Sequence, residues 1–175
     1  MDRNTQGCLL LDWGDTLMRD FEGFNGPMKD WPRLEAVPGA AEMLAVLRPD
    51  WTLGLATNAE DSTEADIRAA LQRVGLDQFL DRVYCFKMIG HKKPSFEFFQ
   101  YILDDLNLSP RFLCMVGDNY HADVLGANAC GIRAIWFNEH SLVVRKGELH
   151  RTIHTLRALP HSLEDFLKPV LSSTP

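Results

Sequence analysis

The chain has 175 residues, of which 46% are hydrophobic and 24% are charged, and its formal net charge is −6. This composition predicts a single soluble globular domain over residues 1–175, long enough to bury a core without disulfide or metal staples. The acidic balance argues against nucleic acid or an anionic membrane as the main partner, because both attract concentrated Lys and Arg.

Hydropathy and cysteine usage indicate the compartment. No apolar stretch reaches the roughly 20 residues that span a bilayer, and the first residues lack the apolar core of a signal peptide. The four cysteines form no Cys-x-x-Cys pair, and three lie in or beside apolar runs, so we expect reduced core residues. These features predict a cytoplasmic protein with no membrane partner.

Short apolar runs, each closed by a polar residue or a glycine, alternate with helical patterns along the chain. The runs predict strands at 8–12, 52–57, 82–86, 112–117 and 133–137. Helical spacing predicts helices at 39–47, 64–74, 96–106, 122–130 and 163–171, the last with Ser162 as N-cap. The alternation predicts an α/β, Rossmann-like three-layer fold, in which helices cover both faces of a central, mostly parallel sheet.

The first predicted strand ends at Asp12, and Gly14 and Asp15 follow within a turn. A buried strand that stops at a carboxylate delivers that side chain to the edge of the sheet. Asp12 is therefore a candidate nucleophile or metal ligand. On this segment alone, the alternative is a polar residue that merely caps the following turn.

Further polar residues are expected at the same edge, because parallel strands present their carboxyl ends together. They are Thr57 and Asn58 after the second strand, Lys93 before Pro94 at the expected start of a helix, and Asp118 and Asp123 after the fourth strand. Taken singly, they have plainer explanations: a strand-ending turn, a solvated cation, a turn former and a residue at a helix N-terminus. Those explanations do not account for their joint order after Asp12.

Four motifs in this order carry a family resemblance over nearly the whole chain. They read Asp-x-Gly-Asp-Thr-Leu from Asp12, Thr57-Asn58, Gly90-His91-Lys92-Lys93-Pro94, and Gly117-Asp118 followed by Asp123. The chain thereby resembles the haloacid dehalogenase-like (HAD) hydrolase superfamily, in its cap-less or minimal-cap phosphatase type. The resemblance implies a Mg²⁺-dependent phosphohydrolase that cleaves a phosphate monoester through an aspartyl-phosphate.

By this resemblance, Asp12 is the covalent nucleophile that attacks phosphorus. Thr57 and Asn58 bind the equatorial oxygens of the phosphoryl group through hydroxyl and amide donors. Lys93 adds a positive charge that offsets both the phosphoryl charge and the repulsion among clustered carboxylates, so it is expected to be catalytic and substrate-binding.

The same resemblance implies a metal site. Mg²⁺ prefers hard oxygen ligands, and the expected ligands are the carboxylates of Asp12, Asp118 and Asp123 with the backbone carbonyl of Gly14. A haloacid dehalogenase attacks carbon and needs no metal, so the pair Asp118 and Asp123 weighs against that branch.

The chain departs from the phosphatase pattern at Gly14. Phosphatases of the family usually have a second Asp there, which protonates the leaving group and later activates water. Asp15 comes one residue later, and it or a neighbouring group could take over; alternatively, the enzyme is slow or uses leaving groups that need little protonation. A third hypothesis is a binding or regulatory relative. His91 and His121 lie within motifs, but we expect structural or substrate-rim roles for them.

Two other classes fit less well. A phosphoacceptor receiver domain would carry its Asp after a central strand rather than the first one. A dinucleotide-binding domain needs Gly-x-Gly-x-x-Gly after a strand, and the sequence has none.

The gaps between motifs are too short for a large cap domain. They leave a flap at about 18–37, in which Phe21, Phe24 and Trp31 form either a hydrophobic lid or core packing. The expected partner is a phosphorylated substrate, either a small molecule or a phosphoprotein. A second subunit could supply a lid, so a homo-oligomer is possible.

Overall fold

The computed structural model of the chain describes residues 7–171. Its strands form one sheet in the order β3-β2-β1-β4-β5-β6, and every neighbouring pair is parallel. The strands are β1 (Cys8–Leu11), β2 (Thr52–Thr57), β3 (Arg82–Cys85), β4 (Leu113–Gly117), β5 (Arg133–Phe137) and β6 (His150–Ile153). The helices are α1 (Ala40–Leu47), α2 (Glu64–Arg73), α3 (Phe86–Ile89), α4 (Phe96–Leu106), α5 (Gly126–Ala129) and α6 (Leu159–Leu171).

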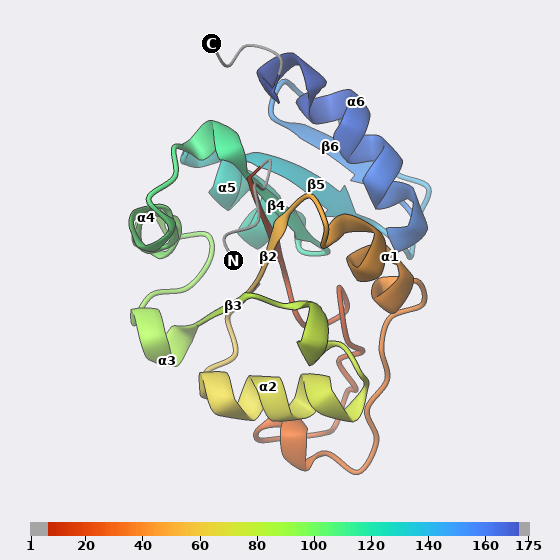
Figure 1. Cartoon of the computed structure of the whole chain (residues 1–175). Helices are drawn as coiled ribbons and strands as arrows, with labels where there is room; N and C mark the ends of the chain where they lie inside the picture. The colour runs from red at the N-terminus through yellow and green to blue at the C-terminus, as the bar shows by residue number, and fades with distance from the viewer. Residues whose placement is uncertain (1–6, 172–175) are drawn as a thin grey trace.

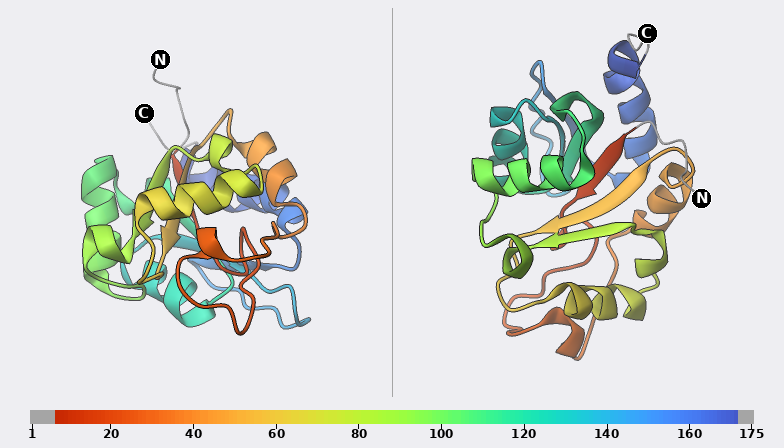
Figure 2. Two further views of the ribbon diagram at one scale, coloured as in Figure 1. Left: turned by 90° about the horizontal axis from the view of Figure 1, so that it is seen from below. Right: turned by 60° about the vertical axis from the view of Figure 1, so that its left-hand side comes forward.

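Helices cover both faces of the sheet (Figures 1 and 2). Side chains from α1, α2 and α6 pack on one face together with Leu9 and Leu11 of β1. Side chains from α4 and α5 pack on the other face with Cys8 and Leu10. All four β1 residues are fully buried, which a continuous apolar strand in the middle of a covered sheet requires. The predicted α/β three-layer fold is confirmed.

One strand was not predicted, and one predicted helix start is wrong. No strand is predicted after residue 137, yet β6 (His150–Ile153) pairs in parallel with β5, and its mostly polar sequence explains the omission. Helix α6 begins at Leu159 after a short 3-10 turn, so Ser162 lies inside it and is not its N-cap. Helix α4 (Phe96–Leu106) has the predicted bounds, and its N-cap is Ser95, so Lys93 and Pro94 lie just before its start.

The predicted helix at 122–130 is replaced by two pieces. A single π-helical segment, η4 (Tyr120–Leu125), leads directly into α5 (Gly126–Ala129). Asn119 caps η4 by accepting a hydrogen bond from the Ala122 amide at 2.9 Å. Wide turns of this kind often occur at functional sites, and this one carries Asp123.

The sequence predicts no membrane-spanning segment and reduced cysteines. Within residues 7–171, none of the helices combines the length and apolarity that crossing a bilayer requires. All four cysteines are free thiols, and three of them are buried in the core.

Candidate active site

A buried lysine lies between two carboxylates at the carboxyl edge of the sheet. Lys93 Nζ is 2.5 Å from Asp12 Oδ1 and 2.7 Å from Asp123 Oδ1, and it donates to the Ala56 carbonyl at 2.7 Å. Only 4% of Lys93 is exposed. Asp12 directly follows β1, and its amide donates to the Val116 carbonyl of β4 at 2.9 Å. Residues far apart in sequence thus meet where the central strands end.

The charges in this cluster support one another. Burial alone would lower the pKa of Lys93, but the carboxylates of Asp12 and Asp123 outweigh it, and the pKa lies above its usual value. Burial raises the pKa of Asp123, and Lys93 opposes that rise. Lys93 therefore stays charged and holds Asp12 in one orientation.

Asn58 fixes the backbone that carries Lys93. Its side-chain Oδ1 accepts from the Lys93 amide at 2.8 Å, and its Nδ2 donates to the Lys93 carbonyl at 2.9 Å. From the sequence, the Asn58 side chain was expected to bind phosphoryl oxygens. In the structure it binds the Lys93 backbone instead, so Asn58 acts as a positioning residue. The Thr57 hydroxyl accepts from the Ala59 amide at 3.2 Å, so its own hydrogen can point elsewhere.

Three carboxylates form a cluster of oxygen atoms. One oxygen from each of Asp12, Asp118 and Asp123 lies within 4.8 Å of the others. A Cβ on Gly117 would lie 2.1 Å from Asp123 Oδ2, so only glycine leaves room for that side chain. Asp123 Oδ1 is buried and, within residues 7–171, its partner is the Lys93 ammonium at 2.7 Å. Clustered carboxylate oxygens of this kind fit a hard cation such as Mg²⁺.

Asp118 is held by neighbours that the sequence reasoning did not single out. The Thr16 hydroxyl accepts from the Asp118 amide at 3.2 Å and donates to Asp118 Oδ1 at 3.4 Å. Trp136 Nε1 donates to the Asp118 carbonyl at 2.7 Å. Burial, followed by the charges of Asp12 and Asp123, raises the pKa of Asp118 to about 7. Thr16 could have been found, because it lies within the first motif.

The turn after Asp12 brings in another carboxylate. Asp15 has a positive φ of 51°, and its Oδ1 accepts from the Asp20 amide at 3.2 Å. A Cβ built on Gly14 would lie 3.4 Å from Asp20 Oδ2. Burial, with the charges of Asp15 and Asp12, raises the pKa of Asp20. Sequence reasoning missed Asp20, which has no motif around it.

These side chains face a pocket of about 480 Å³. All the predicted site residues line it, namely Asp12, Gly14, Thr57, Asn58, Lys93, Asp118 and Asp123. Phe24 and Trp31 of the flap (residues 18–37) form part of a second wall, their rings packed edge to face at 5.4 Å. His91 and His121 are exposed and do not line the pocket.

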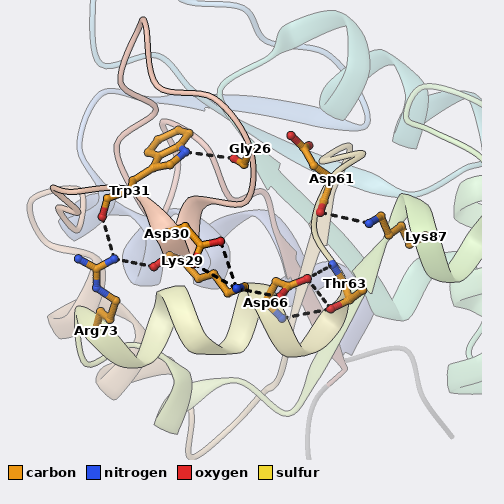
Figure 3. A network of polar contacts seen from close by, with 9 residues as sticks. All are labelled: Gly26, Lys29, Asp30, Trp31, Asp61, Thr63, Asp66, Arg73 and Lys87. Carbon is orange, nitrogen blue, oxygen red and sulfur yellow. Dashed lines mark hydrogen bonds and ion pairs between the residues drawn. The ribbon is translucent and has the colours of Figure 1, made fainter.

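The flap is tied to α2 (Figure 3). Arg73 Nη1 donates to the carbonyls of Lys29 and Trp31 at 2.7 and 2.9 Å. The Lys29 ammonium lies 3.7 Å from Asp66, whose side chain also accepts from Thr63 at the N-terminus of α2. Trp31 is buried among core residues, so the aromatic flap is both core packing and pocket wall.

Replacing Arg73 with Met is expected to loosen the flap. Two charge-assisted hydrogen bonds are lost at an exposed site, which we expect to cost about 1 kcal/mol and to raise the open population about fivefold. Limited proteolysis within 18–37 should accelerate by that factor. The control is Arg33→Met, because Arg33 pairs with Glu35 and lies over the Phe21 ring, both inside the flap. Equal cleavage rates in the two variants would contradict the anchoring role.

The parallel sheet and the acidic pocket at its carboxyl edge define a Rossmann-like α/β protein with a candidate active site at the strand ends. The chain belongs to the haloacid dehalogenase-like hydrolases, since the model of that family matches residues 12–137.

The chain matches parts of longer curated proteins. The chain is 30% identical over 105 residues to pyrimidine 5'-nucleotidase YjjG of Escherichia coli, covering 59% of this chain and 45% of that protein. It is 30% identical over 105 residues to a glyceraldehyde 3-phosphate phosphatase of Pyrococcus furiosus, covering 59% and 42%. The chain thus spans less than half the length of these relatives. The fold resembles an uncharacterized protein from Listeria monocytogenes serotype 4b, with a TM-score of 0.81 at 23% identity over 94% of this chain and 99% of that one.

Proposed function

We propose that the chain is a Mg²⁺-dependent phosphatase that cleaves phosphate monoesters through an aspartyl-phosphate on Asp12. The observation that carries this proposal is the buried Lys93 ammonium, 2.5 Å from Asp12 and 2.7 Å from Asp123, beside the third carboxylate of Asp118. The family membership and the phosphatase and nucleotidase names of the relatives support it.

In the proposed reaction, a carboxylate oxygen of Asp12 forms a bond to phosphorus while the ester P–O bond breaks. The Lys93 ammonium donates to the other oxygen of Asp12 and so orients the carboxylate. Thr57 turns its hydroxyl hydrogen toward a phosphoryl oxygen, and Asn58 keeps Lys93 in place.

Asp12, Asp118, Asp123 and the Gly14 carbonyl would hold Mg²⁺, which neutralises phosphoryl charge when bound. The three clustered carboxylates outnumber the Lys93 ammonium that pairs with two of them, and a divalent cation would offset the excess negative charge. This donor set distinguishes the site from that of a metal-free haloacid dehalogenase.

The substrate is proposed to be a phosphorylated small molecule or a phosphoprotein. The flap takes the place of a cap domain in this proposal, because it forms one wall of the pocket and is fixed to α2. Phe24 and Trp31 then contact the leaving group rather than the phosphoryl group, since they lie on the flap and the phosphoryl site lies at the strand ends.

A panel of phosphate monoesters with Mg²⁺ or with a chelator tests the function. We expect turnover that the chelator abolishes. Chelator-resistant release of halide from a haloacid would support dehalogenase chemistry instead. An absence of turnover across the panel, with tight binding of a phosphorylated ligand, would support a binding or regulatory relative.

Metal binding should depend on pH through Asp118. Without metal, the pKa of Asp118 lies at about 7 rather than 3.8, so the folded state binds the proton more tightly than the unfolded state. The stability of the metal-free protein should therefore fall as pH rises from about 4 to about 7, and Mg²⁺ affinity should fall about tenfold per unit below about pH 7. Calorimetric titration across this range measures the affinity; Asp118→Asn should flatten its pH dependence, and a flat wild-type profile would contradict the assignment.

A further inference from the structure

We propose that Asp20, on the flap, is the proton donor to the leaving group of the ester and then the proton acceptor from the hydrolytic water. The inference rests on the proposed phosphatase function and adds a catalytic residue to it. Cleavage of an ester of a poorly acidic alcohol needs such a group, because an alkoxide leaves slowly unless it is protonated. Asp12 and Asp123 pair with Lys93, and all three carboxylates of the cluster are proposed cation ligands. The proton donor therefore has to be another residue.

Asp20 occupies the space beside the turn that follows the nucleophile. A Cβ on Gly14 would lie 3.4 Å from Asp20 Oδ2 and 3.5 Å from Asp20 Cβ. A carboxylate at residue 14 would thus project into the region that Asp20 already fills. Asp20, six residues after Gly14, places its carboxyl group in that region, and the lack of a side chain at Gly14 leaves space for it.

Asp15 serves to place Asp20 rather than to replace the missing acid. Its positive φ of 51° turns the chain, and its Oδ1 accepts the hydrogen bond of the Asp20 amide at 3.2 Å. The Asp15 amide in turn donates to the Met18 carbonyl at 2.7 Å, which closes the loop. The Asp15 side chain therefore stabilises the loop conformation that places Asp20 beside Gly14.

The surroundings of Asp20 suit a group that must exchange protons. Asp20 lines the same pocket as Asp12 and is exposed to it. Within the described part of the chain, no cation pairs with its carboxyl group, in contrast to Asp12 and Asp123. The carboxyl group is free to carry a proton in one step and to lose it in the other.

The proposed steps balance. In the first, an Asp12 oxygen bonds to phosphorus, the ester P–O bond breaks, and the Asp20 proton passes to the departing oxygen, giving a neutral alcohol. In the second, a water oxygen bonds to phosphorus, the bond between Asp12 and phosphorus breaks, and a water proton passes to the Asp20 carboxylate. Phosphate leaves, and both aspartates return to their starting states.

The test compares two esters whose leaving groups differ in their need for a proton, an alkyl phosphate and dinitrophenyl phosphate. Asp20→Asn should lower kcat/KM for the alkyl ester by about 10² to 10⁴ and that for the dinitrophenyl ester far less. Glu22→Gln, an exposed flap carboxylate outside the pocket, should change neither. Equal losses on the two esters, or a selective loss in Asp15→Asn with none in Asp20→Asn, would overturn the assignment to Asp20.

A double variant that moves the carboxyl group from residue 20 to residue 14 tests whether its position in the pocket matters. Gly14 does not have a positive φ, so an Asp can be accommodated there once Asp20 is shortened. The double variant Gly14→Asp/Asp20→Ser should recover at least about tenfold over Asp20→Ser on the alkyl ester. An unfolding midpoint for each variant checks that the fold persists. A fully folded wild type inactive on both esters would refute the phosphatase function itself, whereas an active wild type whose Asp20→Asn variant keeps full alkyl-ester activity would refute only the role of Asp20.

Discussion

Replacing Asp12 with Asn is expected to lower kcat/KM for every phosphate ester by about 10⁴-fold or more. A carboxamide is a poor nucleophile and cannot form the acyl phosphate, and nucleophile deletions in covalent enzymes have effects of this size. The fold should persist, because Asn keeps the shape of Asp and an acceptor oxygen for Lys93. Steady-state kinetics of wild type and variant over the same ester panel measure the loss.

Two controls separate a loss of the nucleophile from a loss of structure or a general effect of removing a carboxylate. The unfolding midpoint of Asp12→Asn should stay near that of the wild type, so that a loss of activity is not a loss of structure. Asp50→Asn, a change at an exposed carboxylate outside the pocket, should retain full activity. Hydrolysis by Asp12→Asn within about tenfold of the wild type would show that Asp12 is not the nucleophile.

Replacing Lys93 with Met should destabilise the metal-free protein by about 3–5 kcal/mol near neutral pH, because Asp12 and Asp123 would be left without their buried counter-charge. Urea unfolding measures this loss. Acidification should reduce it, since burial raises the pKa of Asp123 and protonation removes the uncompensated charge. Activity should fall about 10³-fold, as expected when a charge that stabilises the transition state is removed.

The neighbouring lysine provides the matched control. Lys92 is partly exposed and pairs with Glu60 at the surface. Lys92→Met should therefore change the free energy of unfolding by only about 0–1 kcal/mol and leave activity intact. If the two variants are equally stable, the ion pairs of Lys93 contribute no more than a surface pair, and the proposed electrostatic role fails.

The fold was predictable because apolar runs mark strands that are covered on both faces. β1 is the best case: its four residues are all buried, and their alternate side chains enter opposite cores. β6 was not predictable in this way, because His150, Arg151 and Thr152 carry no apolar signal and the strand exists through its pairing with β5. The start of α6 was misplaced because a 3-10 turn precedes it and offers no capping residue.

The site residues that directly follow strands could be predicted from sequence motifs. The contacts between residues far apart in the sequence could not. The topology of a parallel sheet suffices to bring Asp12, Thr57 and Asp118 to one edge. The side chain of Asn58 clamps the backbone of Lys93, a contact between residues 35 apart that no local pattern encodes. Asp20 lies near Gly14 only because the loop closes through Asp15, so its proximity requires the three-dimensional structure.

The stereochemical course at phosphorus tests the covalent mechanism most directly. A phosphorothioate ester made chiral at phosphorus with sulfur and two oxygen isotopes is cleaved in water that carries the third oxygen isotope, and the configuration of the released thiophosphate is determined. Attack by Asp12 followed by attack by water inverts phosphorus twice, so the account predicts net retention. Net inversion would mean that water attacks the ester directly, and it would contradict an aspartyl-phosphate on Asp12.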